Sequence, residues 1–361
     1  MNLEETAKAI QPLDKAAMEQ ASRRWDGIAK PLHSLGLLER AVIRIAGMQR
    51  TAKVALSPRA LLIFCADNGV VAQGVTQTDQ SVTALVAENF TKGQTSACVM
   101  AKKAGVDLFP VDIGIAQEKK IPGLLQEKIR PGTADLTQGP AMSRAEAVWA
   151  VEAGIRLSRQ LSRQGYRAIA TGEMGIGNTT TSAAVAAVLL GRDPAQVTGI
   201  GAGLSHEGLI RKVEAIRKGI AVNRPDPADA LDVLAKVGGL DLAGIAGTFL
   251  GGASAGVPVV IDGFISAAAA LIAARICPAS AAYMLASHVS AEPAGQLLLD
   301  ALGQQAILHA QMCLGEGTGA VALFPVLDMG IAVYEQMQSF VEIEMEPYVD
   351  FQKEETPCSR L

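Results

Sequence analysis

The sequence predicts an α/β protein built on a doubly wound, mainly parallel, Rossmann-like sheet. Short apolar runs that favour β-strands alternate with longer apolar runs of helical periodicity along most of the chain. Of the 361 residues, 49% are hydrophobic, only 4% are aromatic, and 36 are glycine. This composition is typical of an α/β enzyme whose large core is packed from small side chains.

The first half of the chain supplies two predicted strands. Leu61–Ala66 (LLIFCA) has the pattern of a buried strand and runs into Asp67-Asn68-Gly69. Ligands bind at the carboxyl edge of open parallel sheets, so Asp67 is a candidate site residue; the alternative is ordinary turn chemistry. The second strand is expected over 106–111. Helices are expected over 12–50 (two, separated by Pro31), from about 83 to 104, and over 143–164, with a long irregular segment at 114–142.

The stretch Arg167–Leu190 (RAIATGEMGIGNTTTSAAVAAVLL) combines a strand, a glycine-rich turn and a helix. Unpaired N–H groups and the helix dipole at such a helix start favour a bound anion. Gly175 and Gly177 would let the backbone approach that anion, and close packing of strand against helix is the alternative. Glu173 is a carboxylate in the predicted turn, which a phosphate site does not require. The glycine turn is not a Walker A loop, because it lacks G-K-[ST]. It also lacks the G-x-G-x-x-G dinucleotide fingerprint, which argues against a nicotinamide-dependent dehydrogenase.

The second half continues the alternation of strands and helices. Strands are expected over 258–262 and 281–287, and helices after a Ser205 N-cap and over 228–253, 263–276, 291–302 and 318–338. Lys212 lies about two turns into the helix that Ser205 caps, where a lone lysine is usually only solvated. Glu316 stands between Gly315 and Gly317, directly before an apolar helix. A carboxylate in that position is either a catalytic base or a helix-capping group.

Charge and cysteine content restrict the class of protein. The formal net charge is −4 and basic residues do not cluster, so neither nucleic acid nor an anionic membrane is an expected partner. The five cysteines are scattered without a C-x-x-C pair, and the four histidines show no ligand spacing. We therefore expect a reducing, cytoplasmic location and no metal site. The N-terminus is charged, unlike a signal peptide, and Gly256–Cys277 is too short and interrupted to span a membrane.

Six stretches in order resemble one family, nicotinate-nucleotide–dimethylbenzimidazole phosphoribosyltransferase, which activates the lower ligand of cobamides. These stretches are RPGTADLTQGPAM (130–142), TGEMGIGNTTTSAA (171–184), GLIRK (208–212), PVVIDGFISAAAAL (258–271), SHVSAEP (287–293) and LGEGTGA (314–320). The resemblance covers about residues 30–345. It implies a large α/β domain over 56–317 and a small helical domain from 1–55 and 318–350, with a loose tail at 351–361.

The resemblance also implies a reaction and a set of residues. The 5-phosphoribosyl group would move from nicotinate mononucleotide to an aromatic base without a cofactor, with Glu316 as the catalytic base. Phosphate would bind at Gly175, Gly177 and the amides of Asn178 and Thr179, with Lys212 beside them and Glu173 on the ribose. The other residues expected to contact substrate are Asp67, Gln80, Ser290, Leu314 and Gly315.

Departures from the family pattern concern the acceptor. The family often has Asp-His-Gly where this chain has Asp67-Asn68-Gly69, and two acids where it has Ser205-His206. The segment 74–83 keeps Gln80 but lacks the aromatic and proline usual before it, and the resemblance places this segment at the acceptor base. The acceptor is therefore expected to be 5,6-dimethylbenzimidazole or, as in one branch of the family, phenol or p-cresol. The family forms dimers, and that branch works as a heterodimer. A non-catalytic subunit that binds nucleotide or supports a partner is the alternative.

Overall fold

The computed structural model describes residues 1–118 and 120–349, which form two compact units. The larger unit comprises Met1–Pro12 and Ala55–Phe324, and the smaller comprises Leu13–Val54 and the chain from Pro325 onward. The tail predicted over 351–361 lies outside the described residues. The first twelve residues differ from the predicted domain boundary, because the first helix packs within the larger unit. There the Leu3 N–H donates to Glu152, and the Tyr283 hydroxyl donates to the carbonyl of Gln11.

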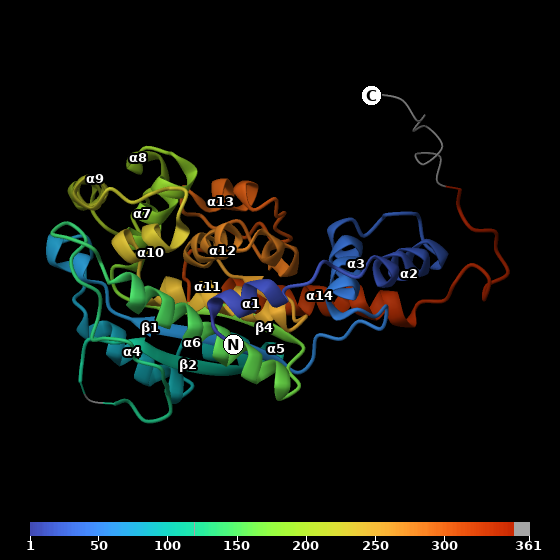
Figure 1. The fold of residues 1–361 in the computed structure, drawn as a ribbon. Coiled ribbons are helices and arrows are strands. Elements are labelled where there is room, and N and C mark those ends of the chain that lie inside the picture. The colour runs from blue at the N-terminus through green and yellow to red at the C-terminus, as the bar shows by residue number, and fades with distance from the viewer. Residues whose placement is uncertain (119, 350–361) are drawn as a thin grey trace. The chain divides into compact units, whose positions relative to one another are not determined.

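Six parallel strands among the described residues form one sheet in the order β3-β2-β1-β4-β5-β6. The strands are β1 (Arg59–Ala66), β2 (Val106–Gly114), β3 (Leu125–Gln126), β4 (Ala168–Met174), β5 (Val259–Ile261) and β6 (Met284–Ala286). This is the doubly wound order in which the chain direction across the sheet reverses between β1 and β4. The predicted fold class is confirmed (Figure 1).

Helices surround this sheet in the larger unit and make up most of the described part of the smaller one (Figure 1). The larger unit contains α1 (Leu3–Ala9), α4 (Ser81–Thr91), α5 (Ser96–Ala104), α6 (Arg144–Arg163), α7 (Asn178–Leu190), α8 (Pro194–Val197), α9 (His206–Asn223), α10 (Ala230–Val237), α11 (Leu240–Ser254), α12 (Phe264–Ile276) and α13 (Gly295–Ala301), with short 3-10 helices at Gly69–Gln73 and Pro278–Tyr283. The smaller unit contains α2 (Lys15–Gly27) and α3 (Leu37–Gln49). The last helix, α14 (Thr318–Gln336), begins in the larger unit and ends in the smaller.

The two faces of the sheet are covered by different elements. Phe64 on β1 packs against Gly244 of α11, whereas Leu61 packs against Gly317 at the start of α14. Because successive side chains of a strand point to opposite faces, α11 and the start of α14 lie on opposite sides of the sheet. On the α11 side, an added Cβ on Gly247 would collide with the carbonyl of Val151 in α6. Glycines thus allow two helix backbones to touch, which explains a large core with few aromatic residues.

The core of the smaller unit is formed by Trp25, Ile28, Ile45 and Met48, which are almost completely buried. The Trp25 ring lies 5.2 Å from the ring of Tyr334 on α14. Within the described residues, α14 alone is long and apolar enough to cross a membrane by length and composition. Half of that apolar window is buried inside the protein.

The predicted elements occur with three differences. The segment from 83 to 104 forms two helices, because Gly93 adopts φ +72° after α4 and Thr95 caps α5 by accepting the Cys98 N–H. Strand β4 runs on through Glu173, which had the pattern of a turn residue. The short elements α1, α8 and β3 and the two 3-10 helices are additional to the prediction, and the second 3-10 helix takes up the first residues of the strand expected over 281–287. Ser205 is the N-cap of α9, as predicted, and its side chain accepts the Gly208 N–H.

Candidate active site

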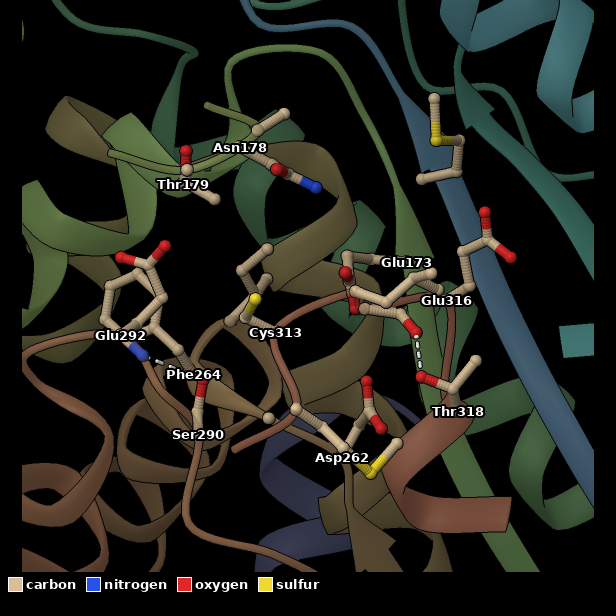
Figure 2. A pocket seen from close by; sticks show the side chains of 18 of the residues that line it. Glu173, Asn178, Thr179, Asp262, Phe264, Ser290, Glu292, Cys313, Glu316 and Thr318 are labelled. Atoms are coloured by element: carbon tan, nitrogen blue, oxygen red, sulfur yellow. Dashed lines mark hydrogen bonds between the residues drawn. The ribbon is translucent and has the colours of Figure 1, made fainter. Parts of the chain in front are cut away.

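A cavity opens at the carboxyl ends of β4, β5 and β6, on one side of the β1/β4 reversal. Its walls come from residues within the segments 173–179, 201–202, 262–265, 288–292 and 312–318. Parallel strands present their carboxyl ends at one edge of the sheet, and ligands bind there in doubly wound folds. The side chains labelled in Figure 2 around the cavity come from the four segments other than 201–202 and include Glu173, Asp262, Ser290 and Cys313.

Glu173, near the carboxyl end of strand β4, lies against the backbone of the Gly315–Gly317 turn. A Cβ on Gly315 would stand only 2.5 Å from Glu173 Oε1, and one on Gly172 would stand 2.8 Å from the Glu316 carbonyl. Glycine at both positions therefore permits the turn to rest on β4. Burial, followed by the charges of Asp262 and Asp241, raises the pKa of Glu173 well above its usual range. Its Oε2 is buried and has no hydrogen-bond partner among the described residues.

Glu316 occupies the middle of a left-handed turn. Its φ is +59°, between +85° at Gly315 and +83° at Gly317. A residue with a side chain in this region carries roughly 1–3 kcal/mol of strain, which is often found at functional sites. Oε2 of Glu316 accepts a long hydrogen bond (3.4 Å) from the Ala97 N–H at the start of α5. The carboxylate thus contacts the start of α5, not of the helix α14 that follows it in the chain, and it also lines the cavity. Burial is the largest cause of its raised pKa.

Asp262 and His288 are functional candidates that sequence reasoning left out. Asp262 follows β5, is 2% exposed, and accepts the N–H groups of Gly317 (3.1 Å) and Ala320 (2.9 Å). His288 follows β6, its charge lowers the pKa of Asp262, and its Nδ1 lies 3.1 Å from Ser287 Oγ. Burial outweighs these influences and raises the pKa of Asp262. An aspartate directly after a buried strand was the available signal, since Asp67 was selected on the same pattern.

Lys212 lies in a second cavity that shares a wall with the first. This second cavity is bordered by residues within 75–78, 175–179 and 200–204 together with Lys212. Lys212 is 1% exposed, and its ammonium donates to Thr179 Oγ1 (2.8 Å) and to the Gly199 carbonyl (3.0 Å). An ammonium has three donors, so one is left for a ligand. Burial lowers the pKa of Lys212 to about 8, against the opposing charge of Glu292.

The start of α7 supplies the anion-binding groups in part. The Asn178 N–H is already bonded to the Gly175 carbonyl (3.0 Å), whereas the Thr179 N–H has no partner among the described residues. Thr179 therefore offers its amide beside its hydroxyl and the Lys212 ammonium. Gly177 adopts φ +93°, and a Cβ on Gly175 would collide with the Ala66 carbonyl. Close packing thus accounts for Gly175, although Gly175 lines both cavities.

The structure gathers most of the predicted residues at these two cavities. The first cavity is lined by Glu173, Gly175, Asn178, Thr179, Ser290, Leu314, Gly315 and Glu316, and the second by Gly175, Gly177, Asn178, Thr179 and Lys212. Asp67 and Gln80 line neither. Asp67 Oδ2 accepts the Ala116 N–H (2.7 Å), and Gln80 donates to the Asn68 carbonyl (3.2 Å). Both side chains support the loop after β1.

Part of the segment 74–83, predicted at the acceptor base, borders the second cavity. Residues 75–78 border it beside Lys212 and Thr179, and the Gln77 amide bonds to the Gly203 carbonyl. Further residues of the first cavity, absent from the prediction, are Phe264, Glu292, Cys313 and Thr318. Phe264 begins α12 directly after Asp262-Gly263, so the same strand end delivers it. Within the described chain, no group of three or more histidine, cysteine, aspartate or glutamate side chains is arranged to hold a metal ion.

The two cavities place an anion site, at Lys212, on one side of a shared wall and two acids, Glu173 and Glu316, on the other. The Lys212 ammonium and the amide of Thr179 favour a phosphate-like group at the start of α7. Glu173 and Glu316 face the other cavity; Glu316, with its raised pKa, is suited to accept a proton, and Glu173, whose pKa is raised further, is suited to hydrogen-bond a ligand. One ligand carrying an anion at one end and a reacting centre at the other would fit this layout.

Comparison with known proteins places the chain in a family. A family model described as phosphoribosyltransferase matches residues 10–344. Nicotinate-nucleotide–dimethylbenzimidazole phosphoribosyltransferase of Ruminiclostridium cellulolyticum is 44% identical over 348 residues, covering 96% of this chain and 99% of that protein. The protein of the same name from Escherichia coli O17:K52:H18 is 42% identical over 336 residues, covering 93% and 94%.

Solved structures agree with the sequence relatives. The crystal structure of nicotinate-nucleotide–dimethylbenzimidazole phosphoribosyltransferase from Thermus thermophilus is 40% identical, with a TM-score of 0.87. The match covers 92% of this chain and 99% of that one. The chain therefore belongs to the nicotinate-nucleotide–dimethylbenzimidazole phosphoribosyltransferase family, as the six sequence stretches predicted.

Proposed function

We propose that this protein transfers the 5-phosphoribosyl group of nicotinate mononucleotide to a cobamide lower-ligand base, giving an α-riboside 5′-phosphate and nicotinate. The observation that carries the proposal is the buried Lys212 ammonium at the start of α7, one shared wall away from Glu173 and Glu316. In this proposal the nucleotide places its phosphate at Lys212 and its ribose toward the two acids.

The acids match the demands of the reaction. The pyridinium of the donor leaves as neutral nicotinate ring nitrogen, taking the electron pair of the glycosidic bond, so the departure needs no general acid. The acceptor must lose a proton as its nitrogen or oxygen bonds to the anomeric carbon. Glu316 accepts that proton, and its raised pKa brings a carboxylate closer to neutral pH, where general bases work best. Glu173, whose raised pKa favours the neutral acid, is placed to hold the ribose hydroxyls of the donor by hydrogen bonds.

Stereochemistry follows from holding both reactants in line. Attack opposite the leaving nicotinate converts the β-nucleotide into an α-riboside. Positioning of the two reactants supplies much of the acceleration, because the encounter becomes effectively intramolecular.

The acceptor is the part of the proposal on which this chain differs from the family pattern. The altered segment 74–83 motivates the choice between 5,6-dimethylbenzimidazole and phenol or p-cresol, although its residues 75–78 border the Lys212 cavity and not the one that Glu316 lines. We propose a dimer, either of two copies or with a homologous subunit, in a reducing cytoplasm. Four described cysteines, Cys65, Cys98, Cys277 and Cys313, are free thiols, which supports that compartment.

The test is a product assay with the purified chain. Nicotinate mononucleotide is supplied with 5,6-dimethylbenzimidazole, adenine, phenol or p-cresol, and products are followed by liquid chromatography with mass detection. Product with the benzimidazole assigns the ordinary family acceptor, and product with phenols alone assigns the phenolic branch. Absence of product with every acceptor favours a subunit that depends on a partner, which a co-purifying homologue would identify; absence of product with that homologue added refutes the catalytic proposal.

A further inference from the structure

The Glu316 side chain is aimed by a turn that does not hold its shape by itself. Three consecutive residues, Gly315, Glu316 and Gly317, have positive φ values. Glycine adopts this conformation freely, but glutamate does so only where its surroundings enforce it. The groups that enforce it therefore determine where the Glu316 carboxylate points.

Asp262 is the side chain that anchors the carboxyl end of this turn. One of its oxygens accepts the Gly317 N–H, the other accepts the Ala320 N–H, and the Gly319 N–H contributes as well. These amides belong to the turn and to the first residues of α14, where the helix dipole favours an anion. Asp262 comes from the end of β5 and is nearly completely buried, so its position is set by the sheet.

We propose that Asp262 is a positioning residue, which fixes the Gly315–Gly317 turn and so aims the Glu316 carboxylate at the acceptor. This inference rests on the proposed function of Glu316 as the catalytic base. Asp262 acts through the backbone: Figure 2 shows its carboxylate below the turn, with the Glu316 side chain projecting away from it. The substrate-contacting group is Glu316, and Asp262 determines its direction.

The charge of Asp262 also affects the pKa of Glu316, and a residue with a merely structural role would not have this effect. Among the described residues, the titratable groups around Asp262 are Glu173 from β4, His288 after β6 and Glu316 itself. Burial is the larger cause of the raised pKa of Glu316, and the Asp262 charge raises it further, while contacts with Thr95 and Ala97 of α5 lower it. Removing the Asp262 charge therefore lowers the pKa of Glu316.

The experiment compares Asp262→Asn with the wild type in the phosphoribosyl-transfer assay across pH. An asparagine presents one N–H₂ toward amides that both donate, so the anchor is lost at one oxygen. We expect kcat to fall about 10–100-fold, as for a reacting group displaced by about 1 Å. The dissociation constant for nicotinate mononucleotide should stay within about threefold, because the Lys212 site is untouched. The acid limb of kcat/KM should move to lower pH.

Asp229→Asn is the matched control, since Asp229 also caps a helix, accepting the Leu231 and Asp232 N–H groups of α10 away from both cavities. Its kcat and pH profile should equal those of the wild type. If Asp262→Asn does not fold, Asp262→Ser supplies a neutral capping hydroxyl at the same place.

In the activity assay, two outcomes overturn the proposal. One is an Asp262→Asn or Asp262→Ser enzyme with wild-type kcat and an unmoved acid limb of kcat/KM, and the other is a loss of kcat in Asp229→Asn equal to that in the Asp262 variant. If the wild type itself makes no product even with a homologous partner added, the proposed function fails separately. A crystal structure of the neutral Asp262 variant then decides, because an unchanged 315–317 turn would refute the anchoring role on its own.

Discussion

Lys212 offers the sharpest test of how the site holds its donor. The change Lys212→Met keeps the apolar stem and removes the ammonium that donates to Thr179 and Gly199. A hydrogen bond from a charged group contributes about 1.5–3 kcal/mol, which corresponds to a loss of about 10- to 100-fold in affinity for nicotinate mononucleotide. Isothermal titration calorimetry at pH 7 without acceptor measures this dissociation constant directly.

Stability separates loss of a contact from misfolding in this variant. The pKa of Lys212 is lowered to about 8 from 10.5, so burying the charged form costs folding roughly 3 kcal/mol at pH 7. Because this folded-state pKa is depressed, the cost is relieved only as pH rises from about 8 toward 10.5. Methionine removes the cost but forfeits two hydrogen bonds from a charged donor, of about 1.5 kcal/mol or more each. The two effects roughly cancel, so the melting temperature at pH 7 should stay close to that of the wild type or fall slightly.

The pH dependence of binding provides a second check. Donor affinity of the wild type should fall as pH rises through about 8, where the free Lys212 loses its proton, and this limb should be missing in Lys212→Met. The control Lys218→Met removes an exposed charge from the same helix. An unchanged dissociation constant in Lys212→Met, or an equal loss in Lys218→Met, would refute the assignment of the phosphate site.

Three further changes test the remaining parts of the site and fold. Glu316→Gln should lower kcat by about 10²–10⁴-fold in single-turnover assays while nicotinate mononucleotide still binds; near-normal turnover would remove Glu316 from the role of base. Gly315→Ala should lower both kcat and the melting temperature, because its Cβ would meet Glu173 at 2.5 Å, whereas Gly303→Ala, at φ +63° in open space, should cost only strain of about 1–2 kcal/mol. Gly247→Ala should reduce the free energy of unfolding by about 1–3 kcal/mol in urea titrations, and an unchanged midpoint would contradict the close packing of α6 on α11.

Alternation of apolar strands and helices was enough to predict the parallel sheet, because that pattern determines which faces can be buried. It could not place Glu173, since the glycine after Thr171 has the pattern of a turn, while the strand continues because Gly172 makes room for the Glu316 backbone. That reason lies far away in the chain and has no local signal. Domain assignment of the first twelve residues failed in the same way, because α1 packs on helices that are distant in sequence.

Site residues were predicted best where a short sequence motif determines both the type of functional group and its local backbone geometry. Thr179 was expected from the glycine turn before a helix, and its amide is free as that pattern requires. Lys212 required the resemblance, because an isolated lysine on a helix gives no signal of burial. Asp67 and Asp262 follow strands in the same manner. Only the structure shows that the first is tied to the Ala116 loop and the second lies on the cavity.

The strand order has a consequence for how precisely the site is spaced. Glu173, Asp262 and His288 stand at or just beyond the ends of β4, β5 and β6, which are consecutive neighbours in the sheet. Hydrogen-bonded strands keep a separation of about 4.8 Å whatever their side chains are. The sheet therefore sets the spacing of these three residues, and the loops beyond the strands determine which ligand is held against them. Exchanging a loop can change the ligand that binds, but the spacing between the three residues stays the same.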